Sequence, residues 1–150
     1  MQGTATTRIE RPAHEVWTMV TDVSRMGAWS PETMSAEWID GATGPAVDAR
    51  FKGKNRRGVL RWTTTVRVDA CEPGRSFEFT VLAGKRDTTR WAYRFEPVDD
   101  QTCDVTESYE VLWEPRYAKI FMPEKRRGPQ LDEGIEMTLA RLKAAAEAGR

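Results

Sequence analysis

The sequence lacks the residues that metal sites and catalytic nucleophiles usually require. It has one histidine, His14, and two cysteines, Cys71 and Cys103, which have no CxxC or Cys/His spacing. Neither a zinc site nor a disulfide framework is therefore predicted. A GxSxG elbow, a GxGxxG fingerprint and a P-loop are also missing. We expect no metal and no cofactor.

An excess of one charge and long apolar runs are also absent. Lysine and arginine number 23, as do aspartate and glutamate, which argues against a dedicated nucleic-acid binder. No apolar stretch approaches the ~20 residues of a membrane span, and the first residues contain no apolar core of a signal peptide. These features predict a cytoplasmic monomer or homodimer, without a nucleic-acid partner and without stable membrane insertion.

What the sequence does have is one domain's length and many tryptophans. Its 150 residues contain no repeat and no low-complexity linker, so we expect a single domain over residues 1–150. The six tryptophans are numerous for this length. Each aromatic ring buries a large apolar area, so they predict either a dense core or an apolar pocket.

Hydrophobic periodicity separates the chain into helices at the ends and strands in the middle. A strand is expected over Thr4–Glu10, and a helix over Ala13–Thr21 is followed by a short helix containing Met26 and Trp29. Six stretches then alternate with a period of two between turn residues: Glu37–Ile39, Ala49–Arg56, Leu60–Ala70, Ser76–Leu82, Thr88–Glu96 and Thr102–Leu112.

The end of the chain is expected to be helical again. A helical turn is predicted over Arg116–Met122, a break over Pro123–Gly128, and a long helix over Gln130–Ala148 with one apolar stripe. Strands joined by short turns, with helices at both ends, indicate an α+β fold. We expect a curved antiparallel sheet wrapped around the long C-terminal helix.

This order of elements resembles the START-like, or birch-pollen-allergen-like, superfamily with its helix-grip fold. Its bacterial branch comprises polyketide cyclase/dehydrase and lipid-transport (SRPBCC) proteins. The matching segments cover about residues 4–147: they are IERPAHEVWTMVTDVSRMGAWSPE, FKGKNRRGVLRWTTTVRVDACEPGRSFEFTV, TTRWAYRFEPVDDQTCDVTESYEV and GIEMTLARLKAAAE. The resemblance implies a cavity between the concave face of the sheet and the closing helix.

Strand parity assigns a mostly aromatic set of side chains to that concave face. With Trp29, which the resemblance places with Glu32 at the cavity mouth, they are our candidates for ligand binding. The alternative is that they simply fill the core. The inward set comprises Phe51, Asn55, Trp62, Thr64, Phe77, Phe79, Trp91, Tyr93, Glu107 and Tyr109.

Glu107 stands out because parity places its carboxylate among apolar neighbours. A buried carboxylate without a partner costs several kcal/mol or has a raised pKa. Three interpretations remain open: it pairs with an inward polar residue such as Asn55 or an arginine, it hydrogen-bonds a ligand, or it is a general acid or base.

Three classes of function follow from these features. Binding or transport of a small hydrophobic molecule, such as a lipid, a polyketide or an aromatic metabolite, is favoured. The alternative is a polyketide aromatase/cyclase or dehydratase that uses Glu107 with Tyr93 or Tyr109, and whether the chain is an enzyme stays open. A protein-interaction module is the third hypothesis.

Basic clusters at Lys54–Arg57, Lys85–Arg86 and Lys125–Arg127 are either solvated loops or contacts for anionic lipid headgroups.

Overall fold

A single antiparallel sheet of seven strands forms one layer of the protein. The computed structural model describes residues 1–149. The strands run in the order β1-β7-β6-β5-β4-β3-β2, because the first strand pairs with the last and the others form a meander. Their bounds are β1 Gln2–Ile9, β2 Thr33–Ile39, β3 Arg50–Arg57, β4 Leu60–Ala70, β5 Ser76–Ala83, β6 Arg86–Asp99 and β7 Thr102–Val111.

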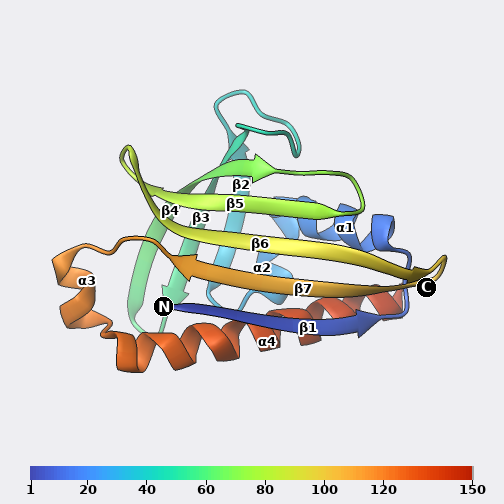
Figure 1. Cartoon of the computed structure of the whole chain (residues 1–150). Helices are drawn as coiled ribbons and strands as arrows, with labels where there is room; N and C mark the ends of the chain where they lie inside the picture. Colours follow the sequence, from blue (N-terminus) through green and yellow to red (C-terminus); the bar gives the residue numbers. More distant parts are fainter. Residues whose placement is uncertain (150) are drawn as a thin grey trace.

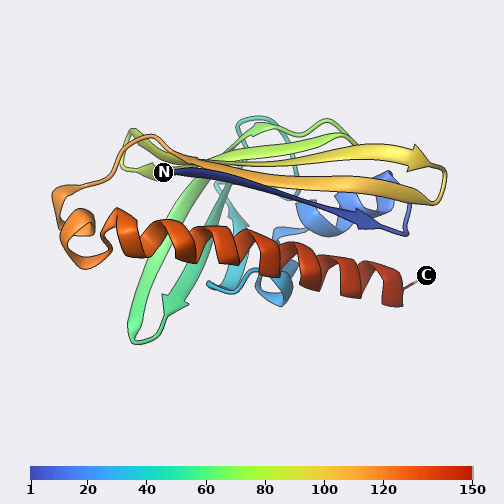
Figure 2. The ribbon, with the colours of Figure 1, turned by 60° about the horizontal axis from the view of Figure 1, so that its bottom comes forward.

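The helices cover the concave side of this sheet. Helix α1 (Ala13–Thr21), the 3₁₀ turn η1 (Val23–Arg25) and α2 (Met26–Trp29) follow β1, and α3 (Arg116–Phe121) precedes the long α4 (Glu124–Ala148). Figures 1 and 2 show α4 on one side of the sheet, running alongside β1. The helix-grip fold is confirmed. Within residues 1–149 no helix is both long and apolar enough to cross a bilayer.

One half of the space under the sheet is filled with side chains. Helix α1 packs against β5, β6 and β7. The Trp17 indole N–H donates a 2.8 Å hydrogen bond to the carbonyl of Ser76 at the start of β5. Val16 and Val23 are fully buried there with Phe77 and with Leu142 of α4. The main core therefore lies under α1, and the cavity described below lies in the other half of this space.

The predicted break before the last helix is wrong. Helix α4 starts at Glu124, and Pro129 lies inside it. A proline in a helix leaves one carbonyl in the preceding turn without its N–H donor. Here that carbonyl belongs to Lys125, which is exposed, so water can satisfy it. The charged residues before Pro129 are good helix formers, and they extend the helix by almost two turns.

Two helical glycines are expected to respond in opposite ways to a methyl group. At Gly134 in α4 the nearest atom to an added Cβ is Pro31 Cγ at 3.8 Å, so Gly134→Ala should stabilise the protein by about 1 kcal/mol through helix propensity. At Gly27 in α2 the Cβ would lie 2.7 Å from the Met34 carbonyl oxygen, so Gly27→Ala should destabilise it. Urea unfolding of both variants measures the difference, and equal effects would contradict it.

Candidate ligand-binding site

A cavity of about 380 Å³ lies between the sheet and α4, in the half of the space under the sheet that α1 leaves open. Side chains from β3 to β7 form its roof, and Leu131, Ile135 and Thr138 of α4 form its floor. The segment from Trp113 to Met122, which includes α3, borders one end. Most of the lining is apolar, as in sites for small molecules.

Eight of the eleven candidate ligand-binding side chains line it. They are Phe51, Asn55, Trp62, Thr64, Phe79, Trp91, Tyr93 and Glu107. The other three, Trp29, Phe77 and Tyr109, do not. Phe77 is fully buried under α1, and Trp29 is buried with the Arg25 guanidinium 5.3 Å from its ring centre. The Tyr109 hydroxyl donates a 2.6 Å hydrogen bond to Asp132 of α4.

Glu107 is the buried acid of this cavity. Only 4 % of its surface is exposed, and it lies directly opposite Tyr93 of the neighbouring strand β6. Burial raises the pKa of Glu107 to about 8, although a hydrogen bond from Tyr93 opposes that rise. Burial, with the nearby Glu107, likewise raises the pKa of Tyr93 well above its usual value. At pH 7 the site therefore holds a neutral carboxyl and a neutral phenol.

One oxygen of Glu107 is left without a partner. The Oε2 atom is buried and makes no hydrogen bond within the part of the chain that the structure describes. An inward polar partner was expected, with Asn55 or an arginine as examples, and the partner is the inward Tyr93. A neutral carboxyl has one O–H donor to offer. Glu107 thus has an unsatisfied hydrogen-bonding atom in the wall of the mostly apolar cavity.

Asn55 belongs to a separate polar cluster on β3. Its amide N–H donates to Thr64 Oγ1 at 3.2 Å, and its Oδ1 accepts from Thr33 at 3.4 Å. Thr33 also bonds the Ser30 hydroxyl. These contacts hold Asn55 in place within the cavity lining.

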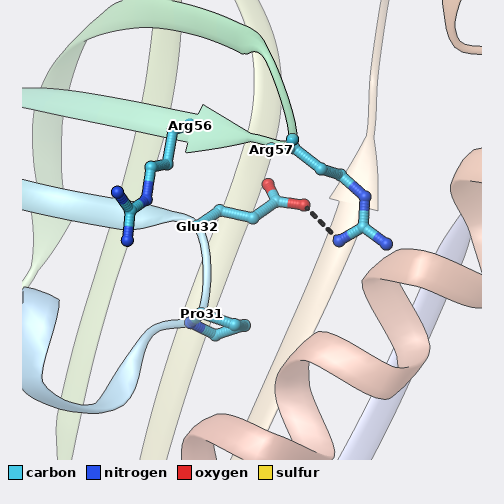
Figure 3. Close-up of a pocket in the computed structure, with 5 residues that line it drawn as sticks. Pro31, Glu32, Arg56 and Arg57 are labelled. Atoms are coloured by element: carbon cyan, nitrogen blue, oxygen red, sulfur yellow. Dashed lines mark hydrogen bonds and ion pairs between the residues drawn. The ribbon is translucent and has the colours of Figure 1, made fainter.

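Charged residues border the cavity beside Pro31. Glu32 accepts a 2.8 Å hydrogen bond from Arg127 Nη2 and contacts Arg57 Nη1 at 3.4 Å. Figure 3 shows Glu32 and Arg57 pointing toward each other. With Pro31, Arg56 and Gly58 they line a more open pocket of about 460 Å³. The pairs join the end of β3 to the start of α4, and both Glu32 and Arg127 line the inner cavity.

Several lining residues were not predicted from the sequence. Val81 and Val111 had the inward parity but stood out less than the aromatic side chains. Leu131 and Ile135 lie on the predicted apolar stripe of the last helix, yet their neighbours Leu139 and Leu142 join the core instead. Parity and helical periodicity identify the inner face, but they do not say how far along each element the cavity extends.

The family model described as polyketide cyclase/dehydrase and lipid transport matches residues 2–147. A Polyketide_cyc-like protein from Corynebacterium glutamicum is 30% identical, with 97% of this chain and 85% of that chain covered and a TM-score of 0.53. A START superfamily protein from Mycobacterium smegmatis is 13% identical over 99% of both chains, with a TM-score of 0.74.

A two-domain protein shows the same fold in a longer chain. The di-domain ARO/CYC protein BexL of the BE-7585A biosynthetic pathway has a TM-score of 0.69 and 15% identity. The alignment covers 96% of this chain and 45% of BexL, so the present chain spans about half of that protein. No curated protein matches the chain.

Proposed function

The chain belongs to the polyketide cyclase/dehydrase and lipid transport family, and from that premise we propose that it binds a small hydrophobic molecule in the cavity under its sheet. A lipid, a polyketide or another aromatic metabolite has the required apolar surface. The cavity volume of about 380 Å³ is within the range of small-molecule sites.

The observation that carries this proposal is the free Oε2 of Glu107. An unsatisfied buried polar group is costly, and native proteins rarely keep one without a reason. Because the carboxyl is neutral at pH 7, a ligand with a carbonyl or hydroxyl oxygen can accept its proton in a hydrogen bond. The preferred ligand is therefore neutral and mostly apolar, with one acceptor group that reaches Glu107.

Native mass spectrometry of protein purified without delipidation tests the proposal. The wild-type protein should carry a bound molecule. The variant Thr138→Trp should lose it, because position 138 lines the cavity and the indole takes up its volume. The matched control Ala140→Trp places the same side chain on the exposed face of α4 and should keep the ligand.

Two results would contradict ligand binding. One is wild-type protein that emerges without any adduct and also fails to bind prodan, a neutral fluorescent naphthalene ketone. The other is an adduct of the same mass and occupancy in the Thr138→Trp variant. Circular dichroism of each variant establishes that a lost adduct reflects a filled cavity in a folded protein.

A cyclase or dehydratase is the second candidate, favoured by the pairing of Glu107 with Tyr93. A neutral carboxyl in an apolar site is a suitable general acid, and the phenol can orient a carbonyl next to it. The fold shared with the ARO/CYC protein is compatible with such chemistry. The bound molecule distinguishes the two candidates: a carrier releases it unchanged, whereas an enzyme releases a dehydrated or cyclised product.

A further inference from the structure

Most of the large apolar side chains that the protein exposes lie in two short segments. They are the tip of the β3–β4 hairpin, Arg56–Arg61, and the segment Leu112–Arg127, which contains α3. Seven of the ten exposed side chains of this kind in residues 1–149 are found there: Val59, Leu60, Leu112, Trp113, Tyr117, Ile120 and Phe121. Val59 is 97 % exposed, Ile120 75 % and Phe121 70 %, and α3 buries none of its residues.

The same two segments concentrate positive charge. They contain eight of the chain's 23 basic residues and two of its 23 acidic residues, although the whole chain is neutral. In the hairpin, Arg56 and Arg61 lie directly opposite each other in the register of the two strands. Like charges in that arrangement repel unless an anion lies near them.

The two segments lie at one end of the molecule. Arg57 of the hairpin and Arg127 of α4 share the carboxylate of Glu32. Figures 1 and 2 both place α3 and the free end of the β3–β4 hairpin at the end where α4 begins. Trp62 and Thr63 beside the hairpin tip, and Tyr117 and Ala118 of α3, line the cavity. We call these two segments the basic apolar end.

We propose that the basic apolar end docks on the surface of a lipid bilayer that contains anionic phospholipids. The apolar side chains of α3 and the hairpin tip enter the interface, and the surrounding arginines and lysines contact the phosphate groups. Trp113 lies at the headgroup level, where aromatic rings are favoured. The Arg86 guanidinium lies over its ring, 4.4 Å from the ring centre.

The charge of the basic apolar end selects this partner over a second copy of the chain. A symmetric dimer would bring the same positive patch of two molecules together, and the repulsion would oppose association. An anionic bilayer supplies the opposite charge and an apolar interior at once. Because cavity-lining residues lie within the basic apolar end, docking also brings the cavity next to the membrane. This inference does not depend on which ligand the cavity holds.

Vesicle flotation tests the proposal with the full chain. Vesicles of phosphatidylcholine mixed with phosphatidylglycerol should carry the protein upward, whereas vesicles of phosphatidylcholine alone should not. The double variant Lys119→Glu, Arg126→Glu should weaken binding by more than about tenfold, since one basic side chain near an anionic surface contributes roughly fivefold. Ile120→Asp with Phe121→Asp should abolish binding by removing the inserted apolar surface.

Two control variants carry the same kinds of change elsewhere. Val98→Asp alters an exposed apolar residue near the β6–β7 turn, and Arg141→Glu reverses an exposed charge on α4. Both should float like the wild type, and all variants should bind prodan in solution as the wild type does. Retained prodan binding separates a failure of docking from a failure of the cavity.

Several outcomes would overturn the docking proposal. They include equal binding to both kinds of vesicle, no binding to either, and flotation that the Lys119/Arg126 and Ile120/Phe121 variants leave unchanged. Size-exclusion chromatography supplies another: a wild-type dimer that Ile120→Asp converts to a monomer would assign the surface to a second copy of the chain.

Discussion

Replacing Glu107 with glutamine is expected to raise the free energy of unfolding by about 4 kcal/mol at pH 8 and to leave it nearly unchanged at pH 4. Glutamine has the size of glutamate and carries no charge at any pH. Its carbonyl can still accept the hydrogen bond from Tyr93. The substitution therefore removes the ionisation of the buried group and little else.

The direction follows from the two pKa values of Glu107. In the unfolded chain its carboxyl ionises around its usual value of 4.5, whereas in the folded protein burial raises the pKa to about 8. Between these values the folded state binds a proton that the unfolded state has lost. Wild-type stability should therefore fall as pH rises through this window, by about 1.4 kcal/mol per pH unit, and level off above pH 8.

Urea unfolding across the pH range measures this difference, with Glu110→Gln as the matched control. Glu110 lies on the same strand, but it is exposed and only loosely paired with Arg90 at 3.9 Å. Its replacement should change stability by no more than about 0.5 kcal/mol at any pH. Parallel stability curves for wild type and Glu107→Gln would show that the folded protein holds Glu107 ionised.

The strands could be predicted closely because alternation and turn residues act locally. Leu60–Ala70 was predicted to the residue, and so was the helix Ala13–Thr21. The start of α4 could not be predicted in this way. Gly128 and Pro129 disfavour a helix locally, but the helix continues through them along the edge of the cavity. The helix-forming charged residues before Gly128 outweigh the cost of these two residues, and water can satisfy the exposed Lys125 carbonyl.

The face of the sheet that carries the candidate site could be predicted, but not how far the cavity extends along each strand. The inward parity of Glu107 and Tyr93 follows from the period of two, and both lie on the concave face. Phe77 has the same parity as Phe79, yet only Phe79 reaches the cavity. The difference arises because α1 covers one end of β5, and one sequence does not reveal how a helix from another part of the chain lies on a strand.

The second large effect concerns ligand affinity and also depends on the proton of Glu107. The affinity of the wild-type protein for prodan should be constant below pH 7 and should then fall, approaching a tenfold loss per pH unit well above pH 8. The ketone oxygen of prodan accepts a hydrogen bond from the neutral carboxyl, whereas an ionised carboxylate offers no donor and repels that oxygen.

Fluorescence titration of prodan measures this dependence, and Glu107→Gln should remove it. The glutamine amide retains N–H donors at every pH, so its affinity should stay flat from pH 6 to pH 10. Tyr93 contributes no titration in this range, because burial raises its pKa well above the usual value. If the affinity of the Glu107→Gln variant for prodan still fell above pH 8, another group would be responsible for the pH dependence. The free oxygen would then play no part in ligand recognition.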